Sequence, residues 1–146
     1  MRDFSNLTFE ESLALEGKNY GEYLAWTTLN WPLSQISEMF FQNVLNWLHM
    51  NKKTFEDIGT TEEAFVERRL EYYRFCAEVC LKRAREIWQE SLQPGFTWTH
   101  KAASEIALMA QQVEKYARKG KTTPAKLGTS KAQLENYQQM YFAQFA

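Results

Sequence analysis

The residues best suited to bind a charged partner are six basic side chains near the end of the chain. No acidic residue occurs between Lys115 and Lys131, and four Thr or Ser hydroxyls lie among them. Lys, Arg, Ser and Thr are the residue types that contact nucleic-acid phosphates. The pattern predicts a candidate anion or nucleic-acid site, and a solvated loop between two helices is the alternative. Its residues are Lys115, Arg118, Lys119, Lys121, Lys126 and Lys131.

Few residues have the spacing of a metal site. Cys76 and Cys80 lie one helical turn apart and could reach one ion, but no second pair of ligands accompanies them. Free cysteines of this kind behave as small buried hydrophobes. Di-iron bundles need a Glu three residues before a His, and that position holds Asn before His49 and Thr before His100. The sequence therefore predicts no metal and no cofactor.

Motifs of known catalytic chemistry are also missing. Gly120-Lys121-Thr122 resembles the end of a phosphate-binding loop, but it follows a helical pattern and lacks the preceding glycine and strand. The Gly-x-Ser-x-Gly motif of hydrolases does not occur. We therefore predict that the protein is not an enzyme.

Aromatic residues are abundant, at 15% of the chain, with ten Phe, seven Tyr and five Trp. Rings on this scale form either a bulky core or a surface for a partner. If they cannot all be buried, the excess marks a contact with another copy, another protein or a hydrophobic particle. The candidate apolar surface comprises Phe41, Trp47, Phe65, Tyr72 and Trp88.

Length and composition are those of one globular domain over residues 1–146. Residues 96–146 hold seven Lys or Arg and three Glu, a net charge of +4, whereas residues 1–95 have a net charge of −5. No signal-peptide pattern, membrane-spanning stretch or disulfide framework is evident. We expect a soluble protein of the cytoplasm without a transmembrane segment.

The elements that must position these residues are two predicted long helices, at 33–58 and 62–92, separated by Gly59-Thr60-Thr61. In the second helix, apolar residues recur at alternating spacings of 4 and 3, the period of a coiled-coil seam. A break this short favours an antiparallel helical hairpin over residues 33–92. The seam residues are Val66, Leu70, Tyr73, Ala77, Cys80, Ala84 and Ile87.

Shorter helices are predicted on both sides of the hairpin. Residues 1–7 form a loose end, and helices follow at about 8–17 and 19–29 before Pro32. A third substantial helix, at about 100–118, has a small-residue inner face, and a basic loop at 119–130 leads to a last helix through Phe145. That helix carries rings and no charge after Glu135, so it docks onto its own domain or onto another copy.

No strand pattern and no internal repeat is evident. The predicted fold is all-α, an antiparallel bundle built on the long hairpin, with short N-terminal helices and two further C-terminal helices.

Part of the chain resembles the phasins, proteins that coat intracellular polyester granules. The resemblance covers about residues 31–92, where an amphipathic helix ends near Asn51-Lys52-Lys53-Thr54-Phe55. A second helix then opens with Glu63-Ala64-Phe65-Val66-Glu67 and runs through Leu70-Glu71-Tyr72-Tyr73 to Ile87-Trp88. The resemblance implies a non-enzymatic, oligomerising, amphipathic coat or scaffold protein.

Two functions follow as hypotheses. The first is a non-catalytic binding or scaffold protein that acts through its aromatic apolar surface, in the manner of a granule coat and as a homo-oligomer or with a protein partner. The alternative is a small helical subunit that binds nucleic acid through residues 115–131.

Overall fold

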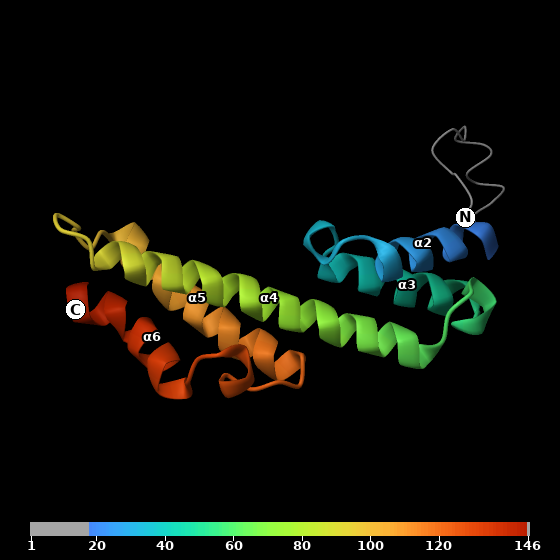
Figure 1. Ribbon diagram of the computed structural model, residues 1–146. Helices are drawn as coiled ribbons and strands as arrows, with labels where there is room; N and C mark the ends of the chain where they lie inside the picture. The colour runs from blue at the N-terminus through green and yellow to red at the C-terminus, as the bar shows by residue number, and fades with distance from the viewer. Residues whose placement is uncertain (1–17, 146) are drawn as a thin grey trace. The chain divides into compact units, whose positions relative to one another are not determined.

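The computed structural model describes residues 18–145, and within that range the protein is all-α (Figure 1). The predicted helix at 8–17 and the predicted loose end at 1–7 lie outside the described residues. The helices are α2 (Lys18–Asn30), α3 (Glu38–Asn51), α4 (Glu62–Ser91), α5 (His100–Lys119) and α6 (Lys131–Phe145), with short 3-10 helices η1 (Leu33–Gln35), η2 (Glu56–Ile58) and η3 (Ala125–Leu127).

Contacts divide the chain into two compact units, residues 1–69 and 70–146, which we call unit 1 and unit 2. The boundary falls inside α4, which is one continuous helix of 30 residues. The first turns of α4 therefore belong to unit 1, and the rest of the helix belongs to unit 2.

The predicted long helix at 33–58 is wrong, because the segment is broken twice. Pro32 precedes η1, and Ile36 and Ser37 are extended before α3 begins at Glu38. The second break follows α3, where Lys52 adopts a left-handed conformation with φ 53°. The predicted hairpin of two long helices is therefore correct only for its second member, α4.

The second break has a local cause. Residues 49–54 are all exposed, so a longer α3 would bury no further apolar surface there. The side chain of Asp57 instead accepts hydrogen bonds from the backbone N–H and the hydroxyl of Thr54, at 2.8 and 3.1 Å. The Thr54 hydroxyl in turn accepts from the Asp57 N–H at 3.3 Å. These bonds start η2 in place of another helical turn.

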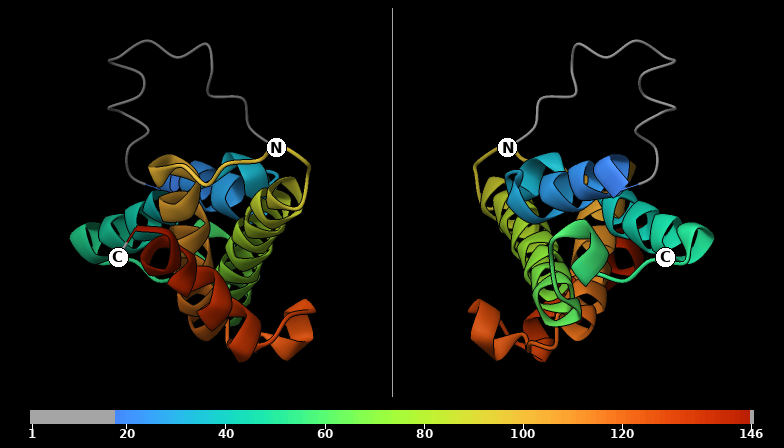
Figure 2. Two further views of the ribbon diagram at one scale, coloured as in Figure 1. Left: turned by 90° about the vertical axis from the view of Figure 1, so that its left-hand side faces the viewer. Right: turned by 90° about the vertical axis from the view of Figure 1, so that its right-hand side faces the viewer.

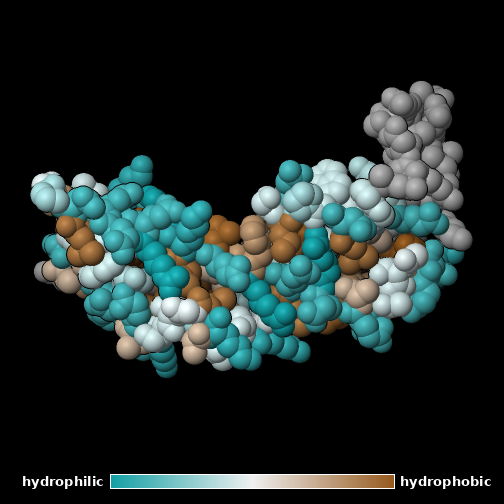
Figure 3. Space-filling view, viewed as in Figure 1, coloured by the Kyte–Doolittle hydropathy of each residue, from teal (hydrophilic) through white to brown (hydrophobic). Residues whose placement is uncertain are grey.

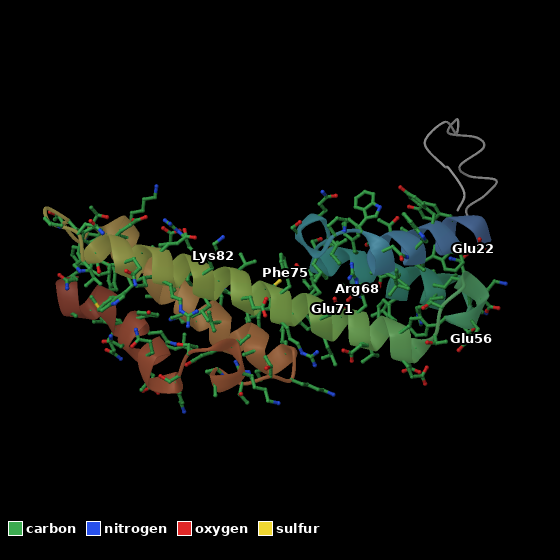
Figure 4. All side chains as sticks on the ribbon, viewed as in Figure 1. Glu22, Glu56, Arg68, Glu71, Phe75 and Lys82 are labelled. Atoms are coloured by element: carbon green, nitrogen blue, oxygen red, sulfur yellow. The ribbon has the colours of Figure 1, made fainter. Side chains whose placement is uncertain are left out.

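Unit 1 packs α2 and α3 with the first turns of α4. The ring of Phe65 on α4 meets the ring of Phe41 on α3 edge to face, with centroids 5.6 Å apart. Arg68 points from α4 toward α2 (Figure 4), where its Nε donates to the Thr28 carbonyl at 3.2 Å. It also donates to the carbonyl of Trp31. Arg68 therefore satisfies carbonyls at the end of α2, which have no partner within that helix.

Unit 2 packs α5 and α6 with the rest of α4, and α5 and α6 lie side by side (Figure 2). The predicted small-residue face of α5 is confirmed, because its five residues are all buried. Small side chains let neighbouring helices approach closely. The buried core consists of Leu81, Ala84, Ile87, Ile106, Ala110, Val113, Leu134 and Tyr137.

The predicted seam on α4 is confirmed in part. Tyr73, Ala77, Ala84 and Ile87 are buried, whereas Val66 is 45% exposed. Leu81, which lies outside the predicted heptad positions, is also buried. Within unit 2 the seam is covered by α5 and α6 rather than by the segment 33–58.

Turn 1, which we define as residues 52–61, joins α3 to α4. It begins at Lys52 and passes through η2 to Gly59, which has a φ of 83°. Residues with a Cβ rarely adopt this conformation, which explains the glycine. Thr61 then caps α4, because its hydroxyl accepts a hydrogen bond from the backbone N–H of Ala64 at 3.1 Å.

Turn 2, residues 121–130, joins α5 to α6 and has the same backbone conformation. Lys121, 69 residues after Lys52, also has a φ of 53°, and Gly128, 69 residues after Gly59, has a φ of 86°. A 3-10 helix lies between them, and the Ser130 hydroxyl caps α6 by accepting a hydrogen bond at 3.1 Å.

The hydrogen bonds and the flanking core positions of the two turns match as well. Buried residues at equivalent positions are Val44 and Val113, Leu48 and Ala117, and Phe65 and Leu134. The expectation of no internal repeat is therefore wrong for these segments. The matched backbone bonds are Lys53 N to Leu48 O with Thr122 N to Ala117 O, Thr60 N to Phe55 O with Thr129 N to Pro124 O, and Gly59 N to Glu56 O with Gly128 N to Ala125 O.

The burial of Ala84 generates a stability prediction. Ala84 is fully buried in the core of unit 2, so Ala84→Glu places a carboxylate where it has no partner. We expect the free energy of unfolding to fall by about 3 kcal/mol or more. Chemical denaturation followed by circular dichroism measures this change.

Val79 provides a matched control on the same helix. Its side chain is 49% exposed, so Val79→Glu should change stability by only about 0.5 kcal/mol. Equal losses in the two variants would contradict the assignment of Ala84 to the core.

Candidate binding surfaces

The rings predicted to form an apolar surface lie mainly in the interior. Phe41, Trp47 and Phe65 are buried in unit 1. Tyr72 and Trp88 are half-buried, and Trp88 packs against the core of unit 2. The predicted aromatic surface is therefore wrong for the first three residues, because helix packing buries their rings.

The face of the molecule in Figure 3 agrees with this placement. Hydrophobic residues, in brown, form small areas that are separated by hydrophilic residues in teal.

Exposed rings gather instead where the end of α6 meets the start of α5. Phe142 is 63% exposed and Phe145 is 37% exposed. The Phe145 ring stacks on His100 with centroids 3.9 Å apart, and the Tyr141 hydroxyl oxygen lies 3.2 Å from Nδ1 of His100. We call His100, Tyr141, Phe142 and Phe145 the α6 ring cluster. The sequence signal for it is the absence of charge after Glu135.

The six basic residues predicted to bind an anion are all exposed, in the second half of α5, in turn 2 and at the start of α6. Two of them cover aromatic rings. Lys119 Nζ lies 5.3 Å from the centroid of the Tyr73 ring, and Lys115 Nζ lies 5.5 Å from that of Tyr116. The Tyr116 ring stacks on Tyr73 and is half-buried, so it offers little surface on which a base could stack.

Backbone geometry argues against a phosphate-binding loop at Gly120-Lys121-Thr122. The N–H groups of Lys121 and Thr122 donate to α5 carbonyls, at 3.1 and 2.9 Å. The carbonyl of Gly120 accepts from Nε of Arg74 at 2.8 Å. These N–H groups close the end of a helix, so they are not arranged to hold a phosphate.

Turn 1 is neutral, because Lys52 and Lys53 balance Glu56 and Asp57, whereas turn 2 has a net charge of +2. Asp57 occupies the position of Lys126, and Glu62, at the start of α4, occupies the position of Lys131. The reversal extends to the whole units. Residues 1–69 contain six Lys or Arg and eleven Asp or Glu, a net charge of −5. Residues 70–146 contain eleven Lys or Arg and seven Asp or Glu, a net charge of +4.

A groove of about 390 Å³ lies beside turn 1. Leu45, Leu48 and Phe55 provide its apolar lining, and Glu56 and Glu62 provide carboxylates. Lys53 and His49 also line it. An apolar floor beside carboxylates suits a lysine side chain, whose methylenes pack on apolar surface while the ammonium group meets an acid.

The two thiols, Cys76 and Cys80, are half-buried. Burial raises the pKa of Cys80, and the neighbouring Cys76 raises it further, so the thiol stays protonated and unreactive at neutral pH. Within residues 18–145, no group of three or more His, Cys, Asp or Glu side chains is placed to hold a metal ion.

An ion pair in unit 2 joins α4 to α5. Arg83 donates from two nitrogens to the two carboxylate oxygens of Glu105, both at 2.9 Å. The hydrogen bond from Arg83 holds the pKa of Glu105 below its usual range. Glu105 likewise raises the pKa of Arg83. Both groups are fixed between two helices, so we assign the pair to stability.

No protein-family model, curated protein or solved structure matches the chain. Among the described helices, none is long and apolar enough to cross a membrane.

The Arg83–Glu105 pair generates a pH prediction. Because the pKa of Glu105 is lowered on folding, its stabilisation is present above the unfolded pKa of about 4.3 and is lost as pH falls through the folded value. Both side chains are about one-third exposed, so Glu105→Gln should cost about 1 kcal/mol or less at pH 7. Denaturation at several pH values measures this, and the difference from wild type should shrink as pH falls below the unfolded pKa.

Glu90 is the control, because its carboxylate lies 4.0 Å from Arg83 and is 61% exposed. Glu90→Gln should leave the pH profile unchanged. A loss in Glu105→Gln that is equally large at pH 3 and pH 7 would contradict the ion-pair assignment.

Proposed function

We propose that the protein is a non-catalytic helical binding and scaffold protein, and that the α6 ring cluster is its apolar contact surface. The observation that carries this proposal is the exposure of Phe142 and Phe145 at the end of an uncharged stretch. Large exposed rings side by side are typical of a surface that contacts a partner. A reducing compartment such as the cytoplasm suits the two free thiols.

The partner with the best chemical fit is an apolar surface. A phasin-like granule coat is one form of this function, because a coat protein adsorbs to a hydrophobic particle. Phe142 and Phe145 would enter the particle surface, and the acidic and basic residues elsewhere on the protein would stay in water. Binding of this kind depends on buried apolar area and not on charge.

Adsorption to particles tests the proposal. We expect the protein to bind polyester or polystyrene beads with an affinity that hardly changes between 50 and 500 mM salt. Burying a Phe side chain contributes about 2 kcal/mol, so Phe142→Ser with Phe145→Ser should weaken binding by about 100-fold or more. Depletion of the protein from solution at increasing bead concentration measures the affinity.

Met39→Ser with Met50→Ser is the matched control, because both side chains are highly exposed apolar groups of unit 1. This variant should bind like wild type. An equal loss in both double variants would show that adsorption is unspecific, and an unchanged affinity of the Phe variant would overturn the proposed surface.

The second candidate function is nucleic-acid binding, which the exposure of all six basic residues at 115–131 favours. Lys and Arg side chains there could neutralise phosphates without reading bases, so binding would be independent of nucleotide sequence. The half-buried Tyr116 weakens the case for single strands, because recognition of single strands uses exposed rings.

A salt titration tests the second candidate. If turn 2 binds nucleic acid, the affinity for a fluorescent duplex should fall steeply as salt rises, and Lys121→Gln, Lys126→Gln and Lys131→Gln together should reduce the slope by about 3. Fluorescence anisotropy measures both effects. No binding at 50 mM salt would exclude this function.

A further inference from the structure

Turns 1 and 2 share one backbone conformation, and the sign of the charge differs at two equivalent positions in or directly after them. Asp57 is replaced by Lys126 at the equivalent position, and Glu62 is replaced by Lys131. Turn 1 also carries Glu56, and α4 continues with Glu63. The equivalent positions in turn 2 and in α6 are both alanine. Figure 4 shows Glu56 at the end of unit 1, on η2.

Six charged side chains in or beside the two turns form no ion pair. Within residues 18–145, none of them has an opposite charge within 4.0 Å, and all six side chains are exposed. With Lys52, Lys53 and Asp57 counted as well, residues 52–63 have a net charge of −2 and residues 121–132 have a net charge of +3. The six residues are Glu56 on η2, Glu62 and Glu63 at the start of α4, Lys121 and Lys126 in turn 2, and Lys131 at the start of α6.

We propose that turn 1 of one molecule docks onto turn 2 of a second copy of the same chain. The net charge of −2 on residues 52–63 and the net charge of +3 on residues 121–132 are complementary in sign. The groove beside turn 1 gives a lysine of the second copy both an apolar floor at Leu48 and Phe55 and carboxylates at Glu56 and Glu62. Lys126 or Lys131 of the second copy fills it.

A second copy fits turn 2 better than a nucleic acid does. Residues 1–69 have a net charge of −5, and this charge repels a polyanion while it attracts the basic turn of another molecule. The rings nearest turn 2, Tyr73 and Tyr116, already lie under Lys119 and Lys115. The contact is heterologous, because turn 1 of one molecule meets a different surface, turn 2, of the other molecule.

The contact extends the scaffold proposal but does not depend on the α6 ring cluster. Exposed charges more than a Debye length apart are screened at physiological salt, so association through the turns must weaken as salt rises. Adsorption to particles through Phe142 and Phe145 must not weaken as salt rises. The two proposals can therefore fail separately.

A charge-swap experiment on the full-length protein tests the inference by sedimentation velocity. The acid-reversed variant carries Glu56→Lys, Glu62→Lys and Glu63→Lys, and the base-reversed variant carries Lys121→Glu, Lys126→Glu and Lys131→Glu. Wild type should associate at 50 mM salt and should do so at least tenfold more weakly at 300 mM salt. Each variant alone should be monomeric, because its residues 52–63 and 121–132 carry the same sign of net charge, and an equimolar mixture should associate again.

A control variant with Glu78→Lys, Glu90→Lys and Glu135→Lys changes the net charge as much as the acid-reversed variant does, but on unit 2 and not at turn 1. It should associate like wild type. Circular dichroism melts of all variants establish that they are folded, and the natural Lys131 at the position equivalent to Glu62 indicates that lysine is tolerated there.

Several results would overturn the inference. They are a monomeric wild type at every salt concentration, a control variant that dissociates like the acid-reversed variant, or a mixture of folded variants that stays monomeric. A monomeric wild type that binds duplex DNA, with binding lost in the base-reversed variant, would assign turn 2 to nucleic acid instead.

Discussion

The structure depends on one helix, α4, whose apolar residues are buried in two separate cores. Phe65 packs on Phe41 in unit 1, while Leu81, Ala84 and Ile87 belong to the core of unit 2. The stability of such a helix comes from tertiary packing more than from helix propensity. Each unit obtains its third helix from α4, so the loss of its first turns removes part of the core of unit 1 and the loss of its last turns removes part of the core of unit 2.

The sequence predicted the helix ends that have strong local signals and missed those that depend on weak ones. Thr99 and Ser130, whose hydroxyls are typical of helix starts, cap α5 and α6, and Pro32 separates α2 from the next element as predicted. The segment 33–58 was predicted as one helix because its apolar period continues across both breaks. The break after α3 depends on the bonds between Thr54 and Asp57. Each contributes about 1 kcal/mol, which a periodic pattern does not reveal.

The candidate surfaces were predictable to different degrees for a similar reason. Exposure of the six basic residues follows from the cost of burying an unpaired charge, so the charge pattern alone located them. Burial of an aromatic ring depends on which helix packs against it. Phe41 is covered by Phe65 from another helix, whereas Phe142, on a stretch equally free of charge, remains exposed. Composition cannot separate these cases, because both rings lie on helical stretches without charged neighbours.

The repeated turn was hidden in the sequence because only the residues that the backbone needs recur. Gly59 and Gly128 hold the left-handed position, and a hydroxyl caps the helix that follows each turn. The charges are free to differ. Asp57 accepts hydrogen bonds from Thr54, yet turn 2 keeps its conformation with Lys126 in that place, through the bond from the Lys126 N–H to the Thr123 hydroxyl. Folding of the turn therefore does not require one particular sign of charge at this position.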